Sequence, residues 1–321
     1  MNGKRVAVII PSWNGRDLTL TCLDSLSKQT FQDFHVIVVD DASTDDTASA
    51  VAHQFPTVDL LRFAKNGGFC AAVNAGIYRA NADLIVLLNN DITLEPDCLE
   101  QLVNAADRHA GDSLFAPLIL WQDAPDTIYS AGDAQLANGR PEPIGFNQPS
   151  ADFAFRHLVF GVSAAAALYR REVFARVGLF DERFNTYFSD SDLNFRARLF
   201  GFKAQFVRQA VCYHIGSASL MGKTLKRTQQ CYVNHLLLLI KNMPAPLYAR
   251  HALAIAHERY HQAKRLFSAA RCESGARFAV RTVLSALWQT IGLLPYAIRQ
   301  RWRIQTARSI SLHELEEQLG P

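Results

Sequence analysis

Four short apolar runs separated by helix-like segments constrain the fold of this chain more than any other feature. The runs are rich in β-branched residues, are bounded by polar residues and recur roughly every 25 residues, at 5–10, 34–39, 58–63 and 83–88. Helical patterns occupy the segments between them, at 17–29, 45–55 and 69–80. Since strands and helices alternate, the sequence predicts an α/β fold in which helices cover both faces of a mostly parallel sheet.

Polar clusters follow three of these four strands. They are PSWNG (11–15), DDASTDD (40–46) and NNDITLEP (89–96). Because ligands of open α/β sheets bind at the carboxyl ends of the strands, we expect the three clusters to meet along one edge. Asp40 and Asp41 could there accept hydrogen bonds from the ribose hydroxyls or base N–H groups of a nucleotide. Helix capping by residues 43–45 explains the polar residues that follow, but not two adjacent acids at the end of a strand.

Asp91 is the candidate metal ligand, because it follows the most apolar of the strands beside two asparagines. A carboxylate with neutral oxygen donors suits a hard divalent cation that keeps several waters and binds phosphate oxygens. A single Asp is a weak signal for a metal, however. Gly67 and Gly68 precede the predicted helix at 69–80, where they would admit a phosphate or let the chain turn, and a turn is the simpler explanation.

Five motifs in chain order resemble those of glycosyltransferase family 2, in its bacterial rhamnosyltransferase-like branch. They are PSWNG, VVDDASTDDT, NGGFCAAVNAG, LLNNDITLEPDCL and GLFDERFNTYFSDSDLNFRARLFGFK, with AVCYH after them, and they span residues 5 to about 215. The resemblance implies the GT-A fold of the nucleotide-diphosphosugar transferases. It also implies that the protein transfers a sugar with inversion of the anomeric carbon and uses Mg²⁺ or Mn²⁺ as cofactor.

The resemblance also assigns residues to the donor site, motif by motif. Asp91 and His214 would bind the metal, and Trp13 would lie against the nucleobase. Asp40 and Asp41 would hold the base and the ribose. The further donor-binding residues of these motifs are Pro11, Asn14, Asn66, Asn74 and Asn90.

Asp190 is the candidate catalytic base. An acceptor hydroxyl must lose its proton as it attacks the anomeric carbon, and a carboxylate opposite the leaving diphosphate can accept that proton. Members of the family read Glu-Asp at this point, where the present chain has Ser189 and Asp190, and Asp192 is the second candidate. Ser189 and Asp192 also have the spacing of a capping box, and a helix that starts there would present Asp190 at the edge of the sheet.

The C-terminal hundred residues differ in composition from the rest. Residues 222–321 carry 15 Lys and Arg against 5 Asp and Glu, a net charge of +10, whereas residues 1–221 have a net charge of −7. This contrast predicts a catalytic domain at 1–221 and a basic helical extension at 222–321. The helical patterns of the extension lie at 228–242, 248–270 and 276–305.

The extension is predicted to lie on a membrane surface rather than to cross it. Arg281 and Pro295 interrupt its best apolar stretch, which stays short of the ~20 residues that span a bilayer. Within 278–303, aromatic and aliphatic residues at helical spacing precede a basic end, a pattern that suits an interfacial helix facing anionic lipid. The arginines of that basic end are Arg299, Arg301 and Arg303. A homodimer or a helix packed between domains is the alternative.

The resemblance, together with these patterns, implies an inverting glycosyltransferase that moves a sugar from a nucleotide-diphosphate donor to a lipid-linked or cell-surface polysaccharide acceptor, with rhamnose among the candidate sugars. Lys223, Lys226 and Arg227 lie in a glycine-containing loop at 217–227 that would close over the donor diphosphate. The expected location is the cytoplasm, at the inner face of the plasma membrane, with no nucleic-acid partner. Six cysteines without a CxxC pair fit a reducing compartment.

A competing interpretation is a nucleotide-sugar-binding or scaffold protein of a glycan assembly complex that has lost catalysis. Ser189 stands at the position of a family acid, and Asn89 stands where relatives carry an acid two residues before the metal-binding Asp. A dinucleotide oxidoreductase is disfavoured because no GxGxxG motif follows the first strand. The apolar run that starts the chain is too short for a signal peptide and is expected to be the first strand.

Overall fold

The computed structural model describes residues 4–216 and 225–320. Within these ranges the chain forms two compact units. The first holds the described residues up to 133 together with 143–197 and 202–216, and the second holds 134–142, 198–201 and the described residues from 225 onward. The predicted domain boundary after residue 221 and most of the predicted loop, residues 217–224, lie outside the described residues.

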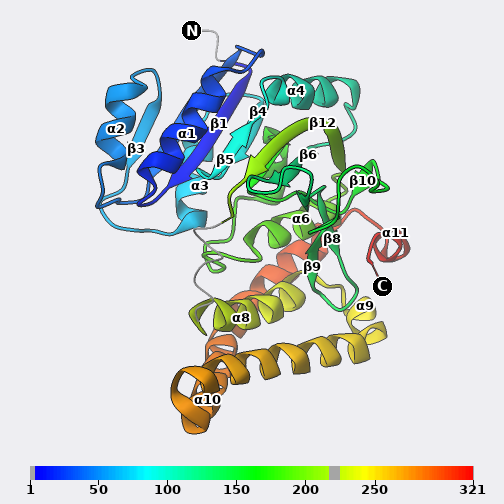
Figure 1. Cartoon of the computed structure of the whole chain (residues 1–321). Helices are drawn as coiled ribbons and strands as arrows, with labels where there is room; N and C mark the ends of the chain where they lie inside the picture. The colour runs from blue at the N-terminus through cyan, green and yellow to red at the C-terminus, as the bar shows by residue number, and fades with distance from the viewer. Residues whose placement is uncertain (1–3, 217–224, 321) are drawn as a thin grey trace. The chain divides into compact units, whose positions relative to one another are not determined.

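A mixed sheet forms the centre of the first unit (Figure 1). Its strand order is β10-β12-β6-β11-β4-β1-β2-β3, with β5 paired to β12 and β7 to β6, and a separate small sheet pairs β8 with β9. The strands are β1 (Val6–Ser12), β2 (Phe34–Asp40), β3 (Asp59–Arg62), β4 (Leu84–Leu88), β5 (Ile92–Leu94), β6 (Leu114–Trp121), β7 (Ile128–Ser130), β8 (Asp133–Gln135), β9 (Pro141–Pro143), β10 (Leu158–Val159), β11 (Ala166–Arg170) and β12 (Ala204–His214).

The first four strands and the three helices between them lie within two residues of the predicted bounds. The helices are α1 (Arg16–Ser27), α2 (Thr47–Gln54) and α3 (Phe69–Arg79). The apolar run at 158–171 forms two strands, β10 and β11, with 160–165 between them. The chain has to leave the sheet there because β10 pairs with β12, whereas β11 pairs with β4 and β6.

Helices cover both faces of the sheet. On one face, α1, α2 and α4 (Cys98–Arg108) pack on the strands in one hydrophobic core. On the other face, α3 packs on β1 and β2, and α5 (Arg171–Val177) packs on β11. A Cβ at Gly76 would lie 2.3 Å from Cγ2 of Ile9, so glycine lets α3 approach β1 closely. Covered on both faces, the strands are continuous apolar runs, and each fully buried Val, Leu or Ile contributes roughly 1.5–3 kcal/mol to stability.

The carboxyl ends of the main strands meet at one edge of this sheet. Strands β1, β2, β3 and β4 are mutually parallel, and β11 is antiparallel to both β4 and β6. Since β12 is parallel to β6, β6 and β12 run in the same direction as β1. The predicted convergence of the strand ends is therefore confirmed, and β12 adds His214 to the same edge.

The second unit is mainly helical. Its helices are α8 (Leu225–Asn242), α9 (Ala245–Arg250), α10 (Ala252–Thr306) and α11 (Leu312–Glu317). The backbone of α10 is non-helical at Ser274 and Gly275, where Gly275 has φ 83°, so the two long helices predicted for this region are confirmed and meet at a kink. Both α10 segments pack on α8 through a small core, formed by Tyr232, Val233, Leu266 and Ala286. Lys226 and Arg227 begin α8 rather than lying in a loop.

Arg301 has a structural role in this unit. Its guanidinium donates hydrogen bonds to the carbonyl oxygens of Ile240 at 2.8 Å and Met243 at 2.7 Å. These are carbonyls at the C-terminal end of α8, which a cation stabilises. Across 4–216 and 225–320, no helix is both long enough and apolar enough to span a membrane.

Candidate active site

The loops after β1 and β2 are bonded to each other. The backbone N–H of Asn14 donates to Oγ of Ser43 at 2.9 Å, and the backbone N–H of Thr44 donates to Oδ1 of Asn14 at 2.8 Å. Asn14 adopts φ 48°, a left-handed conformation that Asn tolerates better than most residues. Only Asp45 of the predicted capping residues serves α2, by accepting from the N–H of Thr47 at 3.1 Å. Helix capping is thus wrong for Ser43 and Thr44, which instead fix the loop that contains Trp13.

Asp41 holds the loop that enters α3. Its carboxylate accepts hydrogen bonds from the backbone N–H groups of Gly67 at 2.6 Å and Gly68 at 2.8 Å, and Asn66 donates to its carbonyl oxygen at 3.3 Å. Asp40 is fully buried, with Oδ2 3.3 Å from Nε of Arg62. Asp41 therefore orders the loop before α3. Asp40 lies beneath the surface that a nucleotide would contact.

Two predicted donor-binding asparagines bond within the protein. Asn90 donates to Oγ1 of Thr19 at 3.2 Å, and a Cβ at Gly15 would lie 2.3 Å from its Nδ2 atom, so Asn90 packs under the loop after β1. Asn74 donates to the carbonyl oxygen of Phe180 at 2.9 Å and accepts from the N–H of Phe180 at 3.0 Å. Both amides order loops of the site. Pro11, by contrast, is the sixth residue of β1 and is part of its ladder.

Asp91 and His214 come together at the edge of the sheet, 123 residues apart in the chain. Nε2 of His214 lies 3.1 Å from Oδ1 of Asp91, and both side chains are nearly buried. The rings of Tyr129 and His214 make a T-shaped contact at 4.4 Å between centroids. Among the described residues, buried Nδ1 of His214 has no hydrogen-bond partner. This pair is the predicted metal site.

The donor set of this pair fits a divalent cation that completes its coordination with substrate. Among the described residues, no group of three or more His, Cys, Asp or Glu side chains could hold a metal. Mg²⁺ binds proteins through one or two carboxylates together with waters and substrate phosphates. Asp91 and His214 would therefore supply the protein ligands, and diphosphate oxygens the others.

The candidate base Asp190 lies in the first turn of α6 (Ser189–Leu199). Its carboxylate accepts hydrogen bonds from the backbone N–H groups of Ser191 at 2.8 Å and Ala164 at 3.4 Å. The next residue, Ala165, accepts from the N–H of Asn89 at 2.8 Å. Hydrogen bonds to residues 164 and 165, which directly precede β11, therefore connect Asp190 to the segment that contains Asp91.

A strained turn connects α6 to the loop that Asp41 holds. Asn185, Tyr187 and Phe188 have φ between 57° and 65°, a conformation that costs about 1–3 kcal/mol per non-Gly residue and is typical of functional sites. The carbonyl oxygen of Asn185 accepts hydrogen bonds from N–H and Sγ of Cys70, at 3.4 and 3.0 Å. A Cβ at Gly68 would lie 2.0 Å from Oδ1 of Asn185. Only glycine at position 68 leaves room for the turn to pack against the start of α3. This contact brings the loop held by Asp41 close to the helix that contains Asp190.

The side chain of Asp192 has a structural role in the core of the protein. It is fully buried and pairs with Nε of Arg196 at 2.8 Å, one turn along α6. Arg196 also donates to the carbonyl oxygens of Val177 and Leu179, both at 2.9 Å. Because this carboxylate faces a buried guanidinium, the geometry corrects the second candidate for the base and favours Asp190. The capping-box interpretation of Ser189 and Asp192 stays a prediction.

Two residues that the sequence analysis missed lie beside Asp190. Burial raises the pKa of Asp133 well above its ordinary value, and the nearby charge of Asp190 raises it further. Burial also raises the pKa of Asp190, against hydrogen bonds from Ser191 and Ala164 that favour its charged form. Burial thus disfavours the charged form of both acids, and the hydrogen bonds that Asp190 accepts oppose this effect. The buried hydroxyl of Tyr169 has no hydrogen-bond partner in the part of the chain that the structure describes. Burial raises its pKa well above the ordinary value, and the charges of Asp190 and Asp133 raise it further.

Replacing Asp133 with Asn is expected to raise stability increasingly as the pH rises. The folded-state pKa of Asp133 exceeds its unfolded value, so the stability that this carboxyl contributes is present at low pH and is lost as the pH rises through the folded-state pKa. Asn does not ionise, so the gain in melting temperature should grow from about pH 4 upward and then level off. Thermal unfolding of both proteins across this range measures the effect, and a gain independent of pH would contradict the assignment.

The family assignment rests on a comparison with known families. The family model described as Glycosyl transferase family 2 matches residues 7–178, more than half of the chain. The chain belongs to glycosyl transferase family 2. The matched residues run from the second residue of β1 to beyond β11, and they include Trp13, Asp41 and Asp91 in the loops at the sheet edge.

Two curated relatives of this family 2 member are named for O-antigen biosynthesis and for rhamnosyl transfer. The O-antigen biosynthesis protein RfbC of Myxococcus xanthus is 30% identical over 223 residues, which are 67% of this chain and 18% of RfbC. An N-acetylglucosaminyl-diphospho-decaprenol L-rhamnosyltransferase of Mycobacterium tuberculosis is 28% identical over 60% of this chain and 70% of its own length. The chain thus spans less than a fifth of one relative and about two thirds of the other.

Solved structures confirm the predicted GT-A fold. The mannosyltransferase PcManGT from Pyrobaculum calidifontis, in complex with GDP-Man and Mn²⁺, superposes with a TM-score of 0.55 at 19% identity and covers 94% of this chain and 85% of its own. GalNAc-T7 with UDP, GalNAc and Mn²⁺ has a TM-score of 0.58 at 15% identity, covering 79% and 52% of the two chains. At these identities the likeness concerns the fold.

Proposed function

We propose that this family 2 member transfers a sugar from a nucleotide-diphosphate donor to a lipid-linked or polysaccharide acceptor, with inversion at the anomeric carbon. The observation that carries the proposal is the chain of contacts that links Asp41, Asp91 and Asp190 at one edge of the sheet. The rhamnosyltransferase among the relatives and the neighbour with bound GDP-Man and Mn²⁺ support this class of donor and acceptor. Rhamnose is one candidate for the sugar.

In the proposed reaction the acceptor hydroxyl attacks the anomeric carbon opposite the nucleoside diphosphate, which leaves with the bonding electron pair. Asp190 accepts the hydroxyl proton as the new bond forms. Burial raises the pKa of this carboxyl, so it is a stronger base than a free Asp. Its hydrogen bonds from Ser191 and Ala164 hold its direction and favour the charged form before reaction.

The donor would lie across the loops after β1, β2 and β4. Trp13 is 58% exposed beside the Asn14 contact and offers its ring to the nucleobase. Mg²⁺ or Mn²⁺ bound by Asp91 and His214 would offset the negative charge of the diphosphate. The contribution of this chain is then to orient the donor and to accept one proton.

A thermal-shift screen of nucleotide sugars, with and without Mn²⁺, tests the proposal. A ligand stabilises the folded state that it binds, so at least one nucleotide sugar should raise the melting temperature, and more so with Mn²⁺. The Asp91→Asn variant should lose the Mn²⁺-dependent part of that shift because the cation loses its carboxylate ligand. Asp33→Asn is the matched control, because Asp33 is exposed and precedes β2, at the end of the strand opposite to the site. No shift with any nucleotide sugar would contradict donor binding, and a shift without turnover would favour the non-catalytic alternative.

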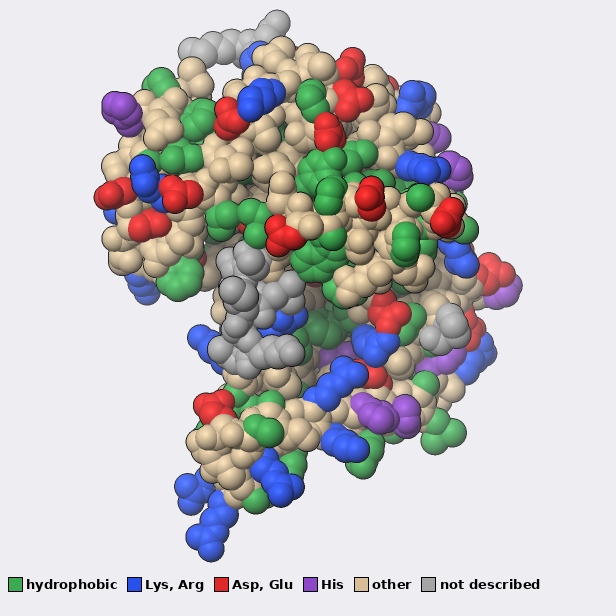
Figure 2. Space-filling model, in the orientation of Figure 1, with side chains coloured by type: hydrophobic (Ala, Val, Ile, Leu, Met, Phe, Trp, Pro, Cys, Tyr) green, Lys and Arg blue, Asp and Glu red, His purple; other side chains and the backbone are tan. Residues whose placement is uncertain are grey.

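We also propose that the helical unit binds the inner face of the plasma membrane. Large apolar side chains recur on the second segment of α10 at helical spacing and are 38–70% exposed, at Leu284, Leu287, Trp288, Ile291, Ile298 and Trp302. Figure 2 shows Lys and Arg side chains gathered over this helical unit. Arg299 and Arg303 are exposed there, whereas Arg301 is used in the cap of α8. An apolar stripe beside basic residues suits an anionic lipid surface.

Replacing Trp288 and Ile291 with Ala is expected to weaken binding to anionic vesicles by removing inserted apolar area. Each arginine near such a surface contributes about 1 kcal/mol, so binding should also fall as salt is added. Co-sedimentation with phosphatidylglycerol vesicles measures both effects. The matched control is Tyr78→Ala, because Tyr78 is 80% exposed on α3 of the other unit. If the wild type does not pellet at low salt but sediments as a dimer in the ultracentrifuge, the stripe is a contact between two copies.

A further inference from the structure

Two histidines one helical turn apart face each other on the first segment of α10. His257 and His261 have i, i+4 spacing, which puts their side chains on the same side of the helix. Their Nε2 atoms lie 3.1 Å apart, and their ring centroids lie 4.4 Å apart. His257 is exposed and His261 is half-buried, so water reaches the pair. Figure 2 shows His side chains at the surface of this helical unit.

The short distance between the two nitrogens restricts the protonation of the pair. At 3.1 Å one Nε2 atom donates a hydrogen bond and the other accepts it. The accepting nitrogen has no proton, so at least one of the two rings is neutral. Two protonated rings would instead point one N–H group at the other, and the pair is therefore not a doubly charged site for an anion. A neutral imidazole with a free lone pair is the form that binds a metal ion.

The same distance is the one expected between two neighbouring ligands of a single metal ion. Bonds between zinc and an imidazole nitrogen are about 2.0–2.1 Å long. With two bonds of this length, nitrogens 3.1 Å apart subtend an angle of about 95–102° at the metal. This angle lies between the roughly 90° of square-planar and the roughly 109° of tetrahedral coordination. The ring torsion of histidine is broad, so a small rotation of each ring would aim both lone pairs at one point.

The surroundings of the pair determine which cations it suits. Glu258, the carboxylate next to His257 in the chain, accepts from the amide of Gln262 at 2.8 Å and lies 3.9 Å from the guanidinium of Arg140. Within 4–216 and 225–320, no group of three His, Cys, Asp or Glu side chains is placed to hold a metal. Water would therefore complete the coordination. Two imidazoles without a carboxylate suit Cu²⁺, Ni²⁺ or Zn²⁺, whereas Mg²⁺ takes oxygen ligands.

We propose that His257 and His261 form a binding site for a transition-metal ion of the Cu²⁺, Ni²⁺ and Zn²⁺ class. Both rings bind through Nε2 in their neutral form, with the remaining proton of each ring on Nδ1. The bound ion links two consecutive turns of α10. Exposed Lys264 and Arg265 occupy the next turn, and their charge opposes the cation, so binding should tighten as salt screens them. The site does not depend on the proposed function.

Titration calorimetry of the full chain with CuCl₂, NiCl₂ and ZnCl₂ tests the proposal, with MgCl₂ as the comparison. His257→Gln and His261→Gln should each weaken Cu²⁺ binding at this site about tenfold or more, because the second imidazole of a chelating pair acts at a high effective concentration. The electron paramagnetic resonance spectrum of bound Cu²⁺ should show two coordinating nitrogens in the wild type and fewer in either variant. Excess Mg²⁺ should not displace the ion.

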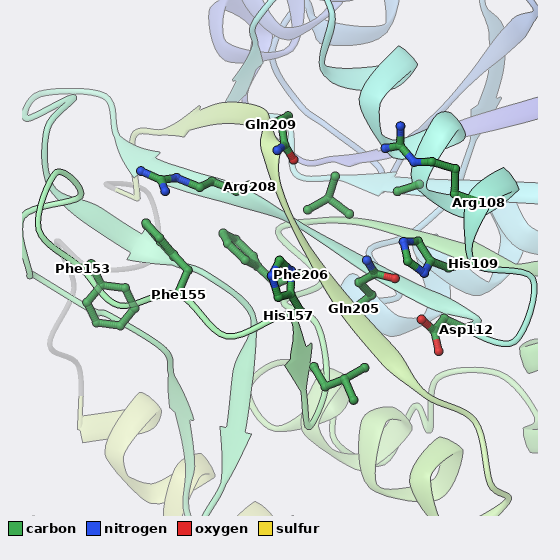
Figure 3. A pocket seen from close by; sticks show the side chains of 13 residues that line it. Arg108, His109, Asp112, Phe153, Phe155, His157, Gln205, Phe206, Arg208 and Gln209 are labelled. Carbon is green, nitrogen blue, oxygen red and sulfur yellow. The ribbon is translucent and has the colours of Figure 1, made fainter.

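The matched controls are His109→Gln and His157→Gln. Both residues are exposed and line the pocket beside α4 and β12, where Figure 3 shows them on opposite sides of Gln205. These variants remove one surface imidazole each but leave the pair on α10 intact, so they should bind Cu²⁺ as the wild type does.

The proposal is overturned if both α10 variants bind all three ions as tightly as the wild type, or if the controls lose as much affinity as they do. Melting temperatures measured without metal should agree among the four variants and the wild type, which separates loss of the site from unfolding. The Mn²⁺-dependent thermal shift with nucleotide sugars reports on the transfer site in the same samples. Failure of that shift with an intact two-nitrogen Cu²⁺ spectrum would reject the proposed function alone.

Discussion

Asp190→Asn is expected to lower turnover by roughly a hundredfold or more while nucleotide-sugar binding stays nearly intact, because general-base catalysis contributes about 10²–10⁴-fold. The amide keeps the size of the carboxyl group and can still accept from the N–H of Ser191, so the helix start should persist. It cannot accept the proton of the acceptor hydroxyl. Turnover is measured as the rate at which nucleoside diphosphate is released in the presence of acceptor. Donor binding is measured as the rise in melting temperature when the nucleotide sugar is added.

The matched control for this change is Asp152→Asn, which removes the same charge at an exposed position. Its turnover should equal that of the wild type. If Asp190→Asn also retained normal turnover, Asp190 would not be the base. If the variant lost donor binding as well as turnover, the carboxylate would serve the donor instead of the acceptor.

Asp192→Asn is expected to destabilise the protein by about 3–5 kcal/mol, because it leaves the buried guanidinium of Arg196 without its counter-charge. The Asp192 side chain is fully buried and that of Arg196 is 7% exposed, so water cannot replace the lost carboxylate. Urea unfolding measures the free-energy change. The molecules that stay folded should turn over normally, since the reaction does not use Asp192.

The chain contains a matched surface pair for comparison. Asp24 and Lys28 are also one helical turn apart, at 2.6 Å, but their side chains are 58% and 65% exposed. Asp24→Asn should therefore change the free energy of unfolding by only about 0.5 kcal/mol or less. If Asp192→Asn kept full stability but lost turnover, Asp192 and not Asp190 would be the base.

The sequence was sufficient to predict the elements of the sheet and where the site lies. Apolar runs of strand length alternate with helical patterns, and this periodicity depends on local backbone geometry and on which side chains face a core. The polar residues that follow β1, β2 and β4 do not fit the apolar pattern of a buried core. They therefore indicated the edge of the sheet at which a ligand binds. The family motifs then singled out Asp91, Asp190 and His214, which lie at this edge or beside it.

What each polar side chain does there was decided by the tertiary structure. Asp190 and Asp192 are two residues apart in one helix, yet one is held by backbone N–H groups and the other by a buried guanidinium. Serine is a common helix-capping residue, but Ser43 accepts a hydrogen bond from the backbone N–H of Asn14 and does not cap α2. Asp133 lies in the short strand β8 and gave no signal in the sequence, although burial beside Asp190 raises its pKa. The sequence determined the elements because their patterns repeat over neighbouring residues; the partners of Asp41, Asp133 and His214 come from segments that only packing brings together.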